Sequence, residues 1–316
     1  MKSPRVVALG GGHGLFATLT ALRAVTSEIT AIVTVADNGG SSGRLREEFP
    51  IFPPGDLRMA LAALCSDDEW GRSWAEVMQY RFTSDGPLNG HAVGNLLLAA
   101  LWDRDEDPVE GLDRVAALLK VSGRVLPMAS EPLDIEATFT QSGQSVFIRG
   151  QKEVADARGK FESLRLIPEN PEARPEALSA LADADVITMG PGSWISSVLP
   201  HLLVPEQRAA LSSSLAIRVL ILNLDGADIG EFAGRSALDH LHAIQKMAPE
   251  LTFHYVVADQ SSVEDSTIAE ELSLKVSTQG GELLVADLRS DRSRIHHDPK
   301  KLALLFSHIV GQTLVG

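Results

Sequence analysis

The sequence predicts an α/β protein with a Rossmann-like, doubly wound and mostly parallel sheet, because strand-like and helix-like apolar patterns alternate along it. Val6–Gly10 is a short apolar run that ends in glycines, and Leu15, Leu19 and Leu22 then recur at helical spacing. Ile29–Ala36 is a second run, rich in β-branched residues. Two buried strands joined by a helix form a right-handed βαβ unit, so the carboxyl ends of both strands meet at one edge of the sheet.

The rest of the chain continues this alternation. Four further apolar runs, each bounded by turn residues or helical patterns, are expected to form strands at Val186–Met189, Ile217–Leu222, Phe253–Ala258 and Leu283–Val285. Apolar residues three and four positions apart predict helices over Leu57–Cys65, Val93–Leu101, Leu112–Leu119, Ala177–Leu181 and Lys300–Ile309.

The middle of the chain predicts an antiparallel insertion. Ile135–Phe139 and Ser145–Ile148 flank the turn sequence Gln141–Gln144, as in a β-hairpin. We therefore expect one domain over residues 1–316, with residues 133–155 forming a hairpin inserted within it.

The composition is that of an ordinary globular protein with an acidic surface. The 316 residues include 28 basic and 42 acidic side chains, which gives a net charge of −14 and a pI near 5.1. Because phosphate backbones and anionic lipid surfaces recruit clustered lysine and arginine, this acidity argues against a nucleic-acid polymer as partner. No apolar run reaches the roughly 18 residues that a membrane span needs, and Cys65 is the only cysteine. We expect a cytoplasmic protein without membrane insertion.

The first candidate site is a glycine-rich turn between a predicted strand and a predicted helix. Glycines in this position let bare backbone N–H groups approach a phosphate at the positive end of the helix. A dinucleotide fingerprint would place its third glycine at position 15, where this chain has Leu15. A turn without a ligand is the alternative. The candidate phosphate contacts are Gly10, Gly11, Gly12, His13 and Gly14.

The second candidate site follows the second predicted strand and reads ADNGGSSGRLR from Ala36 to Arg46. Asp37 comes at the end of the strand, where a carboxylate can bind a ribose or hold Mg²⁺. The glycines and serines offer N–H and hydroxyl groups to an anion, and two arginines supply positive charge. A flexible surface loop that starts with an Asx turn is the alternative. The candidate contacts are Asp37, Asn38, Gly39, Gly40, Ser41, Ser42, Arg44 and Arg46.

Three shorter motifs add further candidates. Asp56 is suited to cap a helix that begins after two prolines, and Arg58 follows it closely. His91 and Asn95 are four positions apart and share one face of a helix, which makes His91 a weak candidate for a catalytic base. A lone histidine is more often structural. A second glycine turn follows a later predicted strand and would form the other half of a crevice, with the residues Gly190, Pro191, Gly192 and Ser193.

Two common kinds of site are missing from the sequence. No Gly-x-x-x-x-Gly-Lys-Ser/Thr run occurs, which argues against a P-loop hydrolase. The neighbouring histidines His240 and His242, and His296 and His297, lack the spacing of a histidine metal site. We expect no required cofactor, and Mg²⁺ at Asp37 is the one metal candidate.

These motifs, in this order, resemble the YvcK family of gluconeogenesis factors and their relatives, the 2-phospho-L-lactate transferases of deazaflavin-coenzyme synthesis. The matching stretches span nearly the whole chain: Gly10–Leu15, Val33–Arg46, Pro53–Arg58, Tyr80–Phe82, Gly90–Leu98, Gly123–Pro127, Gly190–Ser193 and His297–Pro299. The resemblance implies a Rossmann-like CofD fold, binding of a UDP-sugar, and a role linking central carbon metabolism to cell-wall formation and cell shape. Demonstrated catalysis is not part of that picture. The transferase branch moves a phospholactyl group from a guanosine diphosphate carrier to a deazaflavin alcohol with Mg²⁺.

Several positions depart from the family pattern, and three of them bear on the predicted site. Asn38 stands where the family usually has a second aspartate, and His13 replaces a threonine. His296 stands where an arginine is usual, and that arginine would be a natural partner of a diphosphate. The resemblance therefore makes His296 a ligand contact, with a weaker and pH-dependent hold on an anion.

The residues and the resemblance together predict a regulatory protein that binds a UDP-sugar or a related nucleotide. The diphosphate would lie over the first glycine turn, balanced by Arg44, Arg46 and Arg58, with Asp37 and Asn38 toward the ribose or Mg²⁺. The second glycine turn would close the opposite wall. A second copy of the chain and proteins that regulate the cell wall are the other expected partners.

Three alternatives stay open. The chain could be a CofD-like, Mg²⁺-dependent transferase in which His91 or Asp37 acts as base or metal ligand. It could be a dinucleotide-dependent oxidoreductase, against which Leu15 at the third fingerprint position argues. It could also be a protein-interaction scaffold that has lost its ligand.

Overall fold

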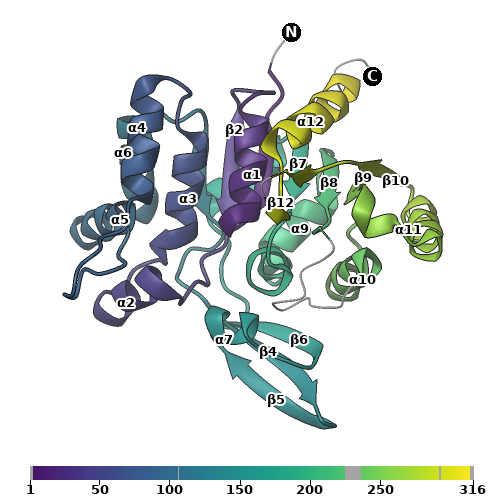
Figure 1. Cartoon of the computed structure of the whole chain (residues 1–316), viewed down its shortest axis with the longest axis horizontal. Helices are drawn as coiled ribbons and strands as arrows, with labels where there is room; N and C mark the ends of the chain where they lie inside the picture. Colours follow the sequence, from purple (N-terminus) through teal and green to yellow (C-terminus); the bar gives the residue numbers. More distant parts are fainter. Residues whose placement is uncertain (1–2, 106, 225–235, 292, 314–316) are drawn as a thin grey trace.

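A seven-stranded parallel sheet forms the centre of the computed structural model, which describes residues 3–105, 107–224, 236–291 and 293–313 (Figure 1). Its strands are β1 (Val6–Gly10), β2 (Ile29–Val33), β3 (Arg124–Pro127), β7 (Val186–Met189), β8 (Ile217–Ile221), β9 (Tyr255–Asp259) and β10 (Glu282–Ala286). They follow the order β10-β9-β8-β7-β1-β2-β3, and each neighbouring pair runs parallel. The predicted Rossmann-like α/β class is confirmed.

The order of the strands reverses at β1. From β1 the chain moves outward through β2 and β3, and the later strands β7 to β10 extend from the other side of β1. Leu9 of β1 pairs with Met189 of β7, so the turns that follow these two strands emerge side by side. In a doubly wound sheet such a reversal opens a crevice outside the carboxyl ends of the strands, and ligands bind there.

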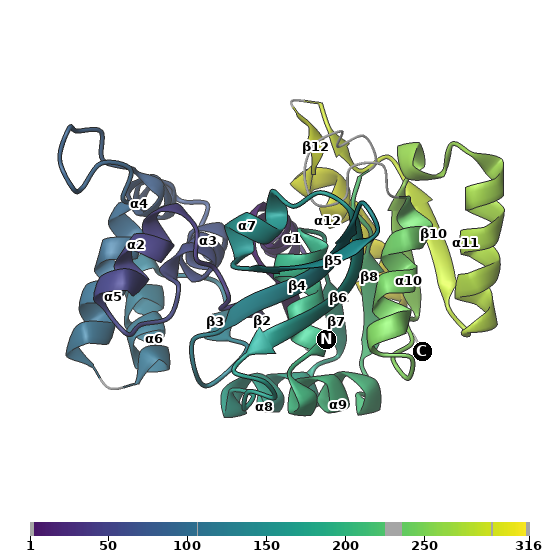
Figure 2. The same cartoon turned by 90° about the horizontal axis from the view of Figure 1, so that it is seen from below.

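Helices cover both faces of the sheet, which explains why its central strands are continuous apolar runs. Every residue of β1 and β7 is buried. Figure 2 shows α1 (Gly12–Leu22) and α12 (Pro299–Thr313) on one face, and α8 (Pro175–Asp183) and α9 (Pro205–Ser213) on the other. The predicted helices at residues 177–181 and 300–309 are confirmed as parts of α8 and α12.

The last third of the chain completes the edge of the sheet beyond β8. It contributes two helices, α10 (Ala237–Met247) and α11 (Ser266–Thr278), and the short ladder of β11 (Arg289–Ser290) and β12 (Ser293–His297). Three short helical turns connect the elements: η1 (Trp194–Val198), η2 (Leu199–Leu202) and η3 (Gln260–Val263). Within the described part of the chain, no helix combines the length and the apolar character needed to cross a bilayer.

A group of five helices separates β2 from β3 and stands at one side of the sheet (Figure 2). Its members are α2 (Gly40–Glu48), α3 (Pro54–Leu64), α4 (Glu69–Gln79), α5 (Val93–Arg104) and α6 (Pro108–Leu119). Helix α3 packs against α1, and α4, α5 and α6 pack around the outer side of α3. The helices predicted within α3, α5 and α6 are confirmed, whereas α2 and α4 were not identified from the sequence.

The insertion in the middle of the chain is a three-stranded antiparallel sheet. The strand β4 (Asp134–Gln141) lies between β5 (Gln144–Arg149) and β6 (Lys160–Ile167), and α7 (Gln151–Ala155) follows β5. The predicted hairpin is β4–β5, but its predicted end at residue 155 is too early, because β6 completes the sheet. Only Leu164 and Leu166 of β6 are buried, so its apolar pattern is weak. Figure 1 shows this small sheet below the carboxyl edge of the large one.

The predicted second strand is longer than the observed one. The apolar run continues to Ala36, but β2 ends at Val33, where its regular pairing with β3 also ends. The N–H of Met128 donates to the carbonyl of Val33 (2.9 Å), and the N–H of Leu133 donates to that of Val35 (3.1 Å). The segment that leaves β3 therefore covers these buried residues without a regular ladder.

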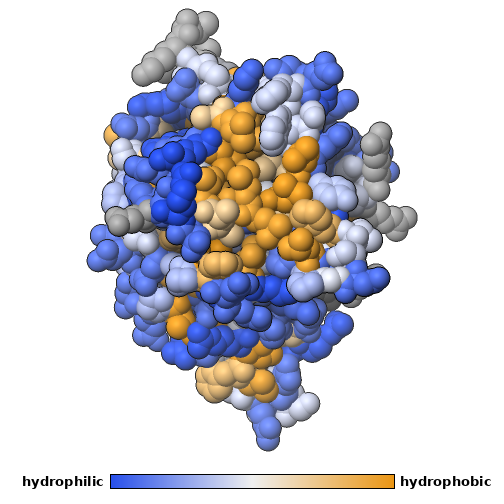
Figure 3. Space-filling model, turned by 90° about the vertical axis from the view of Figure 1, so that its left-hand side faces the viewer, coloured by the Kyte–Doolittle hydropathy of each residue, from blue (hydrophilic) through white to orange (hydrophobic). Residues whose placement is uncertain are grey.

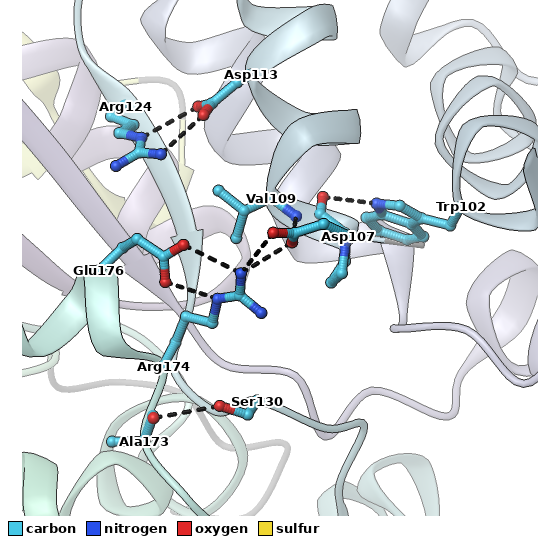
Figure 4. Close-up of polar contacts among 10 residues, drawn as sticks. Trp102, Asp107, Val109, Asp113, Arg124, Ser130, Ala173, Arg174 and Glu176 are labelled. Carbon is cyan, nitrogen blue, oxygen red and sulfur yellow. Dashed lines mark hydrogen bonds and ion pairs between the residues drawn. The ribbon is translucent and has the colours of Figure 1, made fainter. Parts of the chain in front are cut away.

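Two arginines fasten the helical group to the rest of the protein (Figure 4). Arg174 donates to Asp107 at the start of α6 (2.8 Å) and to Glu176 of α8 (2.7 Å). Arg124 of β3 donates to Asp113 of α6 (2.8 Å). Because the side chain of Arg174 is only 15% exposed, its ion pairs are screened less than those on the open surface. These contacts fix α6 relative to β3 and α8.

Candidate nucleotide-binding site

A cavity of about 330 Å³ opens where the turns after β1 and β7 meet. Its wall comes from segments that are far apart in the sequence, and it includes both predicted glycine turns. The lining residues are Gly11, Gly12, His13, Gly14, Ala17, Asp56, Gln151, Pro191, Gly192, Ser193, Ser196, Ser197, Asn223, Leu224, Ile295, His296 and His297. The reversal of the strand order thus brings together the two glycine turns, which lie 180 positions apart in the sequence.

The two glycine turns touch, and their contact depends on the absence of side chains. A Cβ atom on Gly14 would lie 2.1 Å from the carbonyl oxygen of Pro191, a distance that no real structure tolerates. A Cβ atom on Gly11 would lie 2.4 Å from Oδ2 of Asp56. The N–H of Gly190 donates to the carbonyl of Leu9 (3.1 Å), which extends the β1–β7 ladder into the turn. The predicted juxtaposition of the two turns is therefore present.

The second turn is held by a side chain that lies outside the predicted motifs. Asn223 follows β8, and its Oδ1 accepts a hydrogen bond from the N–H of Gly192 (2.9 Å). Its Nδ2 donates to the carbonyl of the same glycine (2.8 Å). The N–H of Gly192 is thereby engaged within the protein, so the second turn supplies the shape of the wall and not a backbone donor at this position.

The first turn is also the amino end of a helix. Helix α1 begins at Gly12, and Gly11 before it has no side chain with which to cap the first turn. First-turn N–H groups have no partner within a helix, and the helix dipole makes this end positive. The N–H of Gly12 donates to Asp56. The amino end of α1 faces the cavity with His13 and Gly14 in its lining, which is the arrangement that binds anions in this fold class.

Two histidines lie close together at the cavity. The rings of His13, from α1, and His296, from β12, have centroids 5.5 Å apart. Burial lowers the pKa of His13, and the nearby His296 and Arg58 lower it further. Burial also lowers the pKa of His297 to about 4. The imidazoles of His13 and His297 are therefore neutral at neutral pH in the free protein, and a bound anion would shift His13 toward its charged form.

Two carboxyl groups lie behind the first turn. Burial raises the pKa of Asp56 to about 7, and the neighbouring charge of Asp37 raises it as well. Burial likewise raises the pKa of Asp37, although the N–H of Gly39 donates to its Oδ1 (2.7 Å) and opposes that shift. Asp56 lines the cavity and Asp37 does not. A neutral Asp56 removes a repulsive charge from the wall and can donate a proton to a hydrogen bond.

Four candidates from the sequence form a buried chain of hydrogen bonds outside the cavity. The Nε of Arg58 donates to Oδ1 of Asn95 (2.8 Å), and the Nδ2 of Asn95 donates to the hydroxyl of Ser41 (3.0 Å). That hydroxyl is hydrogen-bonded to Nδ1 of His91 (3.0 Å). Burial lowers the pKa of Arg58 to about 10. Burial also lowers the pKa of His91 below its ordinary value. The chain joins α2, α3 and α5, and none of its members lines the cavity.

The segment expected to cradle an anion is instead the first turn of α2. Its serine hydroxyls point inward, since Ser42 accepts the N–H of Gly55 (3.0 Å) and Ser41 belongs to the buried chain. Arg44 donates to the carbonyls of Pro87 (3.2 Å) and Asn89 (2.7 Å). A regular helix starts at Gly40 and buries the side chains of Ser41 and Ser42, so the two hydroxyls are not available to an anion, and the contact of Gly39, Gly40, Ser41 and Ser42 with a phosphate through their N–H groups stays a prediction.

The other polar residues of this segment hold the inserted sheet. Arg46 donates to the carbonyl of Asp37 (3.1 Å) and to Asp134 of β4 (3.1 Å). Asn38 donates to Glu153 of α7 (3.1 Å). Neither Arg46 nor Asn38 lines the cavity. In this structure both side chains serve to position the insertion above the site.

A comparison with known sequence families shows to which family the chain belongs. Residues 6–298 match the family described as 2-phospho-L-lactate transferase CofD. The chain belongs to the CofD family. The gluconeogenesis factor of Listeria monocytogenes is 35% identical to it over 269 residues, which cover 85% of this chain and 80% of the relative. A Mycobacterium tuberculosis relative that carries the same name provisionally is 46% identical over 308 residues, covering 96% and 90%.

The fold of this CofD-family protein also matches a crystal structure. A UPF0052-family protein from Bacillus halodurans aligns with a TM-score of 0.85 and 33% sequence identity. The alignment covers 96% of this chain and 99% of the other. The resemblance to the gluconeogenesis factors that the motifs suggested is confirmed over nearly the whole chain.

Several lining residues of the CofD-family site could not be singled out from the sequence. Gln151 begins α7. No local motif connects this helix to Gly11 in the first glycine turn, which lines the same cavity but lies 140 positions earlier in the sequence. Ser196 and Ser197 belong to the helical turn after the second glycine turn. Asn223 directly follows a predicted strand. Its position at the carboxyl end of that strand is the sequence feature that could have indicated a place in the site.

Asp37 and Asp56 are the residues of the CofD-family site that fit a divalent cation. Mg²⁺ is commonly held by one or two carboxylates together with substrate phosphates and water. Oδ2 of Asp56 is buried without a hydrogen-bond partner among the described residues, and a cation would offset the charge of both carboxylates. Within the described ranges no three or more acidic, histidine or cysteine side chains group around a metal position, so ligand oxygens would complete the coordination.

Proposed function

We propose that this CofD-family protein binds a nucleotide sugar of the UDP-sugar class in the cavity between the two glycine turns. The diphosphate lies at the amino end of α1, next to His13 and His296. The sugar or the nucleoside extends past Asn223 and Gln151 toward the inserted sheet. The observation that carries this proposal is the contact of two glycine turns at the reversal point of a doubly wound sheet.

The charges around the cavity support a diphosphate as the ligand. The positive end of α1 and the imidazoles of His13 and His296 face the space, and Asp56, the carboxyl group that lines it among the described residues, has a pKa of about 7. A neutral acid at this position can donate to a phosphate oxygen, whereas a carboxylate would repel it. A volume of about 330 Å³ lies within the range of small-molecule sites.

Titration calorimetry with UDP-N-acetylglucosamine and UDP-glucose tests this binding. We expect saturable heat with at least one of the two, and His296→Ala should weaken binding by about tenfold through loss of a charge-assisted contact. His308→Ala, on the exposed side of α12, is the matched control and should bind like the wild type. No heat at millimolar ligand, or equal affinity of the His296 and His308 variants, would count against the proposal.

The proposal includes a regulatory role that links carbon metabolism to cell-wall formation and cell shape. Its support is the relationship to proteins named gluconeogenesis factor. Growth of a deletion strain on a gluconeogenic carbon source, complemented by wild type or by His296→Ala, tests this role together with the shape of the cells. Complementation by a variant that no longer binds the nucleotide would refute a ligand-dependent role.

A second candidate function is a CofD-like, Mg²⁺-dependent group transfer. The observation that favours it is the buried carboxyl pair Asp37 and Asp56, since two such groups with raised pKa values suit a cation. When bound, Mg²⁺ would offset the charge that develops on a diphosphate. The two aspartates would hold it, and the amino end of α1 would orient the phosphate.

Product analysis separates the two functions. The protein is incubated with Mg²⁺, a guanylylated lactyl donor and a deazaflavin acceptor, and GMP is measured. Release of GMP that Asp37→Asn abolishes would establish the transferase. Calorimetric UDP-sugar binding without GMP release, unchanged by removal of Mg²⁺, would establish the binding function alone.

A further inference from the structure

The outer side of the helical group carries an apolar surface. Figure 3 shows a broad continuous apolar area in the middle of this side, surrounded by hydrophilic residues. We call it the apolar face and define it by Trp70 and Val77 of α4, Val93, Leu97 and Leu101 of α5, and Leu118 of α6. Trp70, Val77 and Leu118 are each at least 40% exposed, which is unusual for three neighbouring large apolar side chains.

Helix α5 is apolar on nearly all sides, although only one side is fully buried and the side with Leu97 and Leu101 is partly buried. Gly94, Leu98 and Trp102 are buried and point toward the rest of the helical group. Val93, Leu97 and Leu101 follow one another at spacings of four and remain partly exposed. A helix with apolar residues all round is normally enclosed on every side. The outward side of α5 therefore has the composition of an interface.

The contributions of α4 and α6 join that of α5 into one surface. The indole N–H of Trp70 donates to the carbonyl of Leu118 (3.2 Å), which connects α4 with α6. The rings of Trp70 and Trp74 have centroids 5.7 Å apart. Helices α4, α5 and α6 all contact one another. Three helices of this length, about 9 Å apart, present an area on the order of 500 Å².

The size and charge of this surface fit a second copy of the chain. Standard interfaces bury about 800 Å² on each partner, with an apolar core inside a polar rim. The apolar face supplies such a core, and the same three helices expose charged side chains of both signs, with Glu76 on α4, Arg104 on α5, and Glu110 and Arg114 on α6. A two-fold axis pairs one patch with itself, so a rim of mixed charge can complement its own copy. A net charge of −14 otherwise disfavours contact between copies.

We propose that two copies of this protein associate through their apolar faces, with α5 of one copy packed against α5 of the other around a two-fold axis. This inference is independent of the proposed ligand. Figure 1 places α4, α5 and α6 on the side of the molecule away from β12, so both cavities stay open in the dimer. The arginine contacts of Figure 4 hold α6 in place, and the interface is therefore a rigid part of the fold.

Sedimentation equilibrium of the full chain tests the dimer. One chain has a mass of 33.9 kDa, and we expect the wild type to sediment with twice that mass at micromolar concentration. Leu97→Glu puts a charge at the centre of the apolar face and should raise the dissociation constant on the order of 100-fold. The matched control is Leu304→Glu on α12, where the leucine is 75% exposed, and it should remain dimeric.

A second measurement covers the case in which Leu97→Glu fails to fold. Amide hydrogen exchange of the wild type is compared at 1 µM and 100 µM, and α5 should exchange more slowly at the higher concentration while α11 is unchanged. A wild type that stays monomeric at 100 µM would overturn the proposal and leave the face to a different protein. A dimer that a folded Leu97→Glu variant does not weaken would also overturn it.

Discussion

The side-chain amide of Asn38 donates a hydrogen bond to the carboxylate of Glu153, which lies 115 positions further along the chain (3.1 Å). The carbonyl oxygen of the same amide accepts the N–H of Lys152 (3.2 Å). Asn38 thus engages both a side chain and the backbone of α7, the helix whose first residue, Gln151, lines the cavity. Asn38, which is also a predicted ligand contact, thus holds the inserted sheet over the site.

Replacing Asn38 with aspartate, the residue usual in the family, should loosen α7. Asn38→Asp removes the donor to Glu153 and sets two carboxylates against each other, while the bond from Lys152 can persist. We expect a loss of about 1 kcal/mol in the free energy of unfolding and faster amide exchange in residues 151–155. Urea denaturation and hydrogen exchange measure the two effects.

If repulsion between the carboxylates at positions 38 and 153 loosens α7, a change at Glu153 should reverse the effect. Adding Glu153→Gln to Asn38→Asp supplies a new donor and should restore slow exchange in α7. Asn170→Asp, at an exposed position, is the matched control and should leave α7 unchanged. If the double variant exchanges as fast as Asn38→Asp alone, the contact does not hold α7.

The contact of the two glycine turns predicts the effect of a single methyl group. Gly14→Ala would place its Cβ 2.1 Å from the carbonyl of Pro191, so the backbone must move. We expect a loss on the order of 2 kcal/mol in stability and weaker nucleotide binding, measured by thermal unfolding and calorimetry. Gly311→Ala, also within a helix but with no atom near its Cβ, should raise stability by about 0.5 to 1 kcal/mol. Equal stability of the two variants would contradict the tight contact.

The parts of the fold that the sequence predicted are those set by local patterns. Apolar runs and their spacing located β1, β7 and α5 because burial imposes the period of each element. The glycine turns could be placed at one edge because parallel strands end there. The strand β6 was missed because it lies on the small sheet and buries just Leu164 and Leu166, too few to form a pattern.

The hydrogen-bond partners of individual polar residues could not be predicted from the sequence. Ser41 and Arg44 look equally available beside glycines, but Ser41 is bound by His91 and Asn95, from α5 and the segment before it. Arg46 meets Asp134, which lies on the inserted sheet 88 positions away. Such partners depend on tertiary contacts, and neither motif nor composition encodes them.

The raised pKa of Asp56 predicts a particular dependence of stability on pH. A folded-state pKa of about 7, against an ordinary value of 3.8, means that the folded protein binds the proton more tightly than the unfolded chain. This contribution to stability is present in acid and is lost as the pH rises from about 4 through about 7. Asp56→Asn cannot ionise, so its stability relative to the wild type should increase on the order of 2 kcal/mol between pH 5 and pH 8.

Chemical denaturation at several pH values measures this difference. Asp113→Asn, which alters an exposed carboxylate far from the cavity, serves as the control and should show no such rise at alkaline pH. A difference between Asp56→Asn and wild type that stays constant from pH 5 to pH 8 would show that Asp56 is already ionised at pH 5.

The histidine pair predicts that nucleotide-sugar affinity falls as the pH rises. Burial, His296 and Arg58 lower the pKa of His13, so its imidazole is neutral near pH 7 in the free protein. A bound diphosphate favours the charged form, and binding then takes up a proton. The diphosphate of a nucleotide sugar has no proton of its own to lose in this range. We expect the dissociation constant to rise up to about tenfold per pH unit between pH 5.5 and pH 7.5.

Calorimetry in two buffers of different ionisation enthalpy measures the proton uptake directly. The double variant His13→Gln and His296→Gln should bind weakly and lose the part of the slope that the imidazoles supply, while His308→Gln keeps the slope of the wild type. Glutamine at these positions can donate hydrogen bonds but does not titrate, so a slope that remains in the double variant is expected to come from Asp56, which lines the cavity and has a pKa of about 7. Affinity of the wild type that is flat from pH 5.5 to pH 7.5 would mean that neither imidazole contacts the diphosphate, and the ligand would then be held by the amino end of α1 alone.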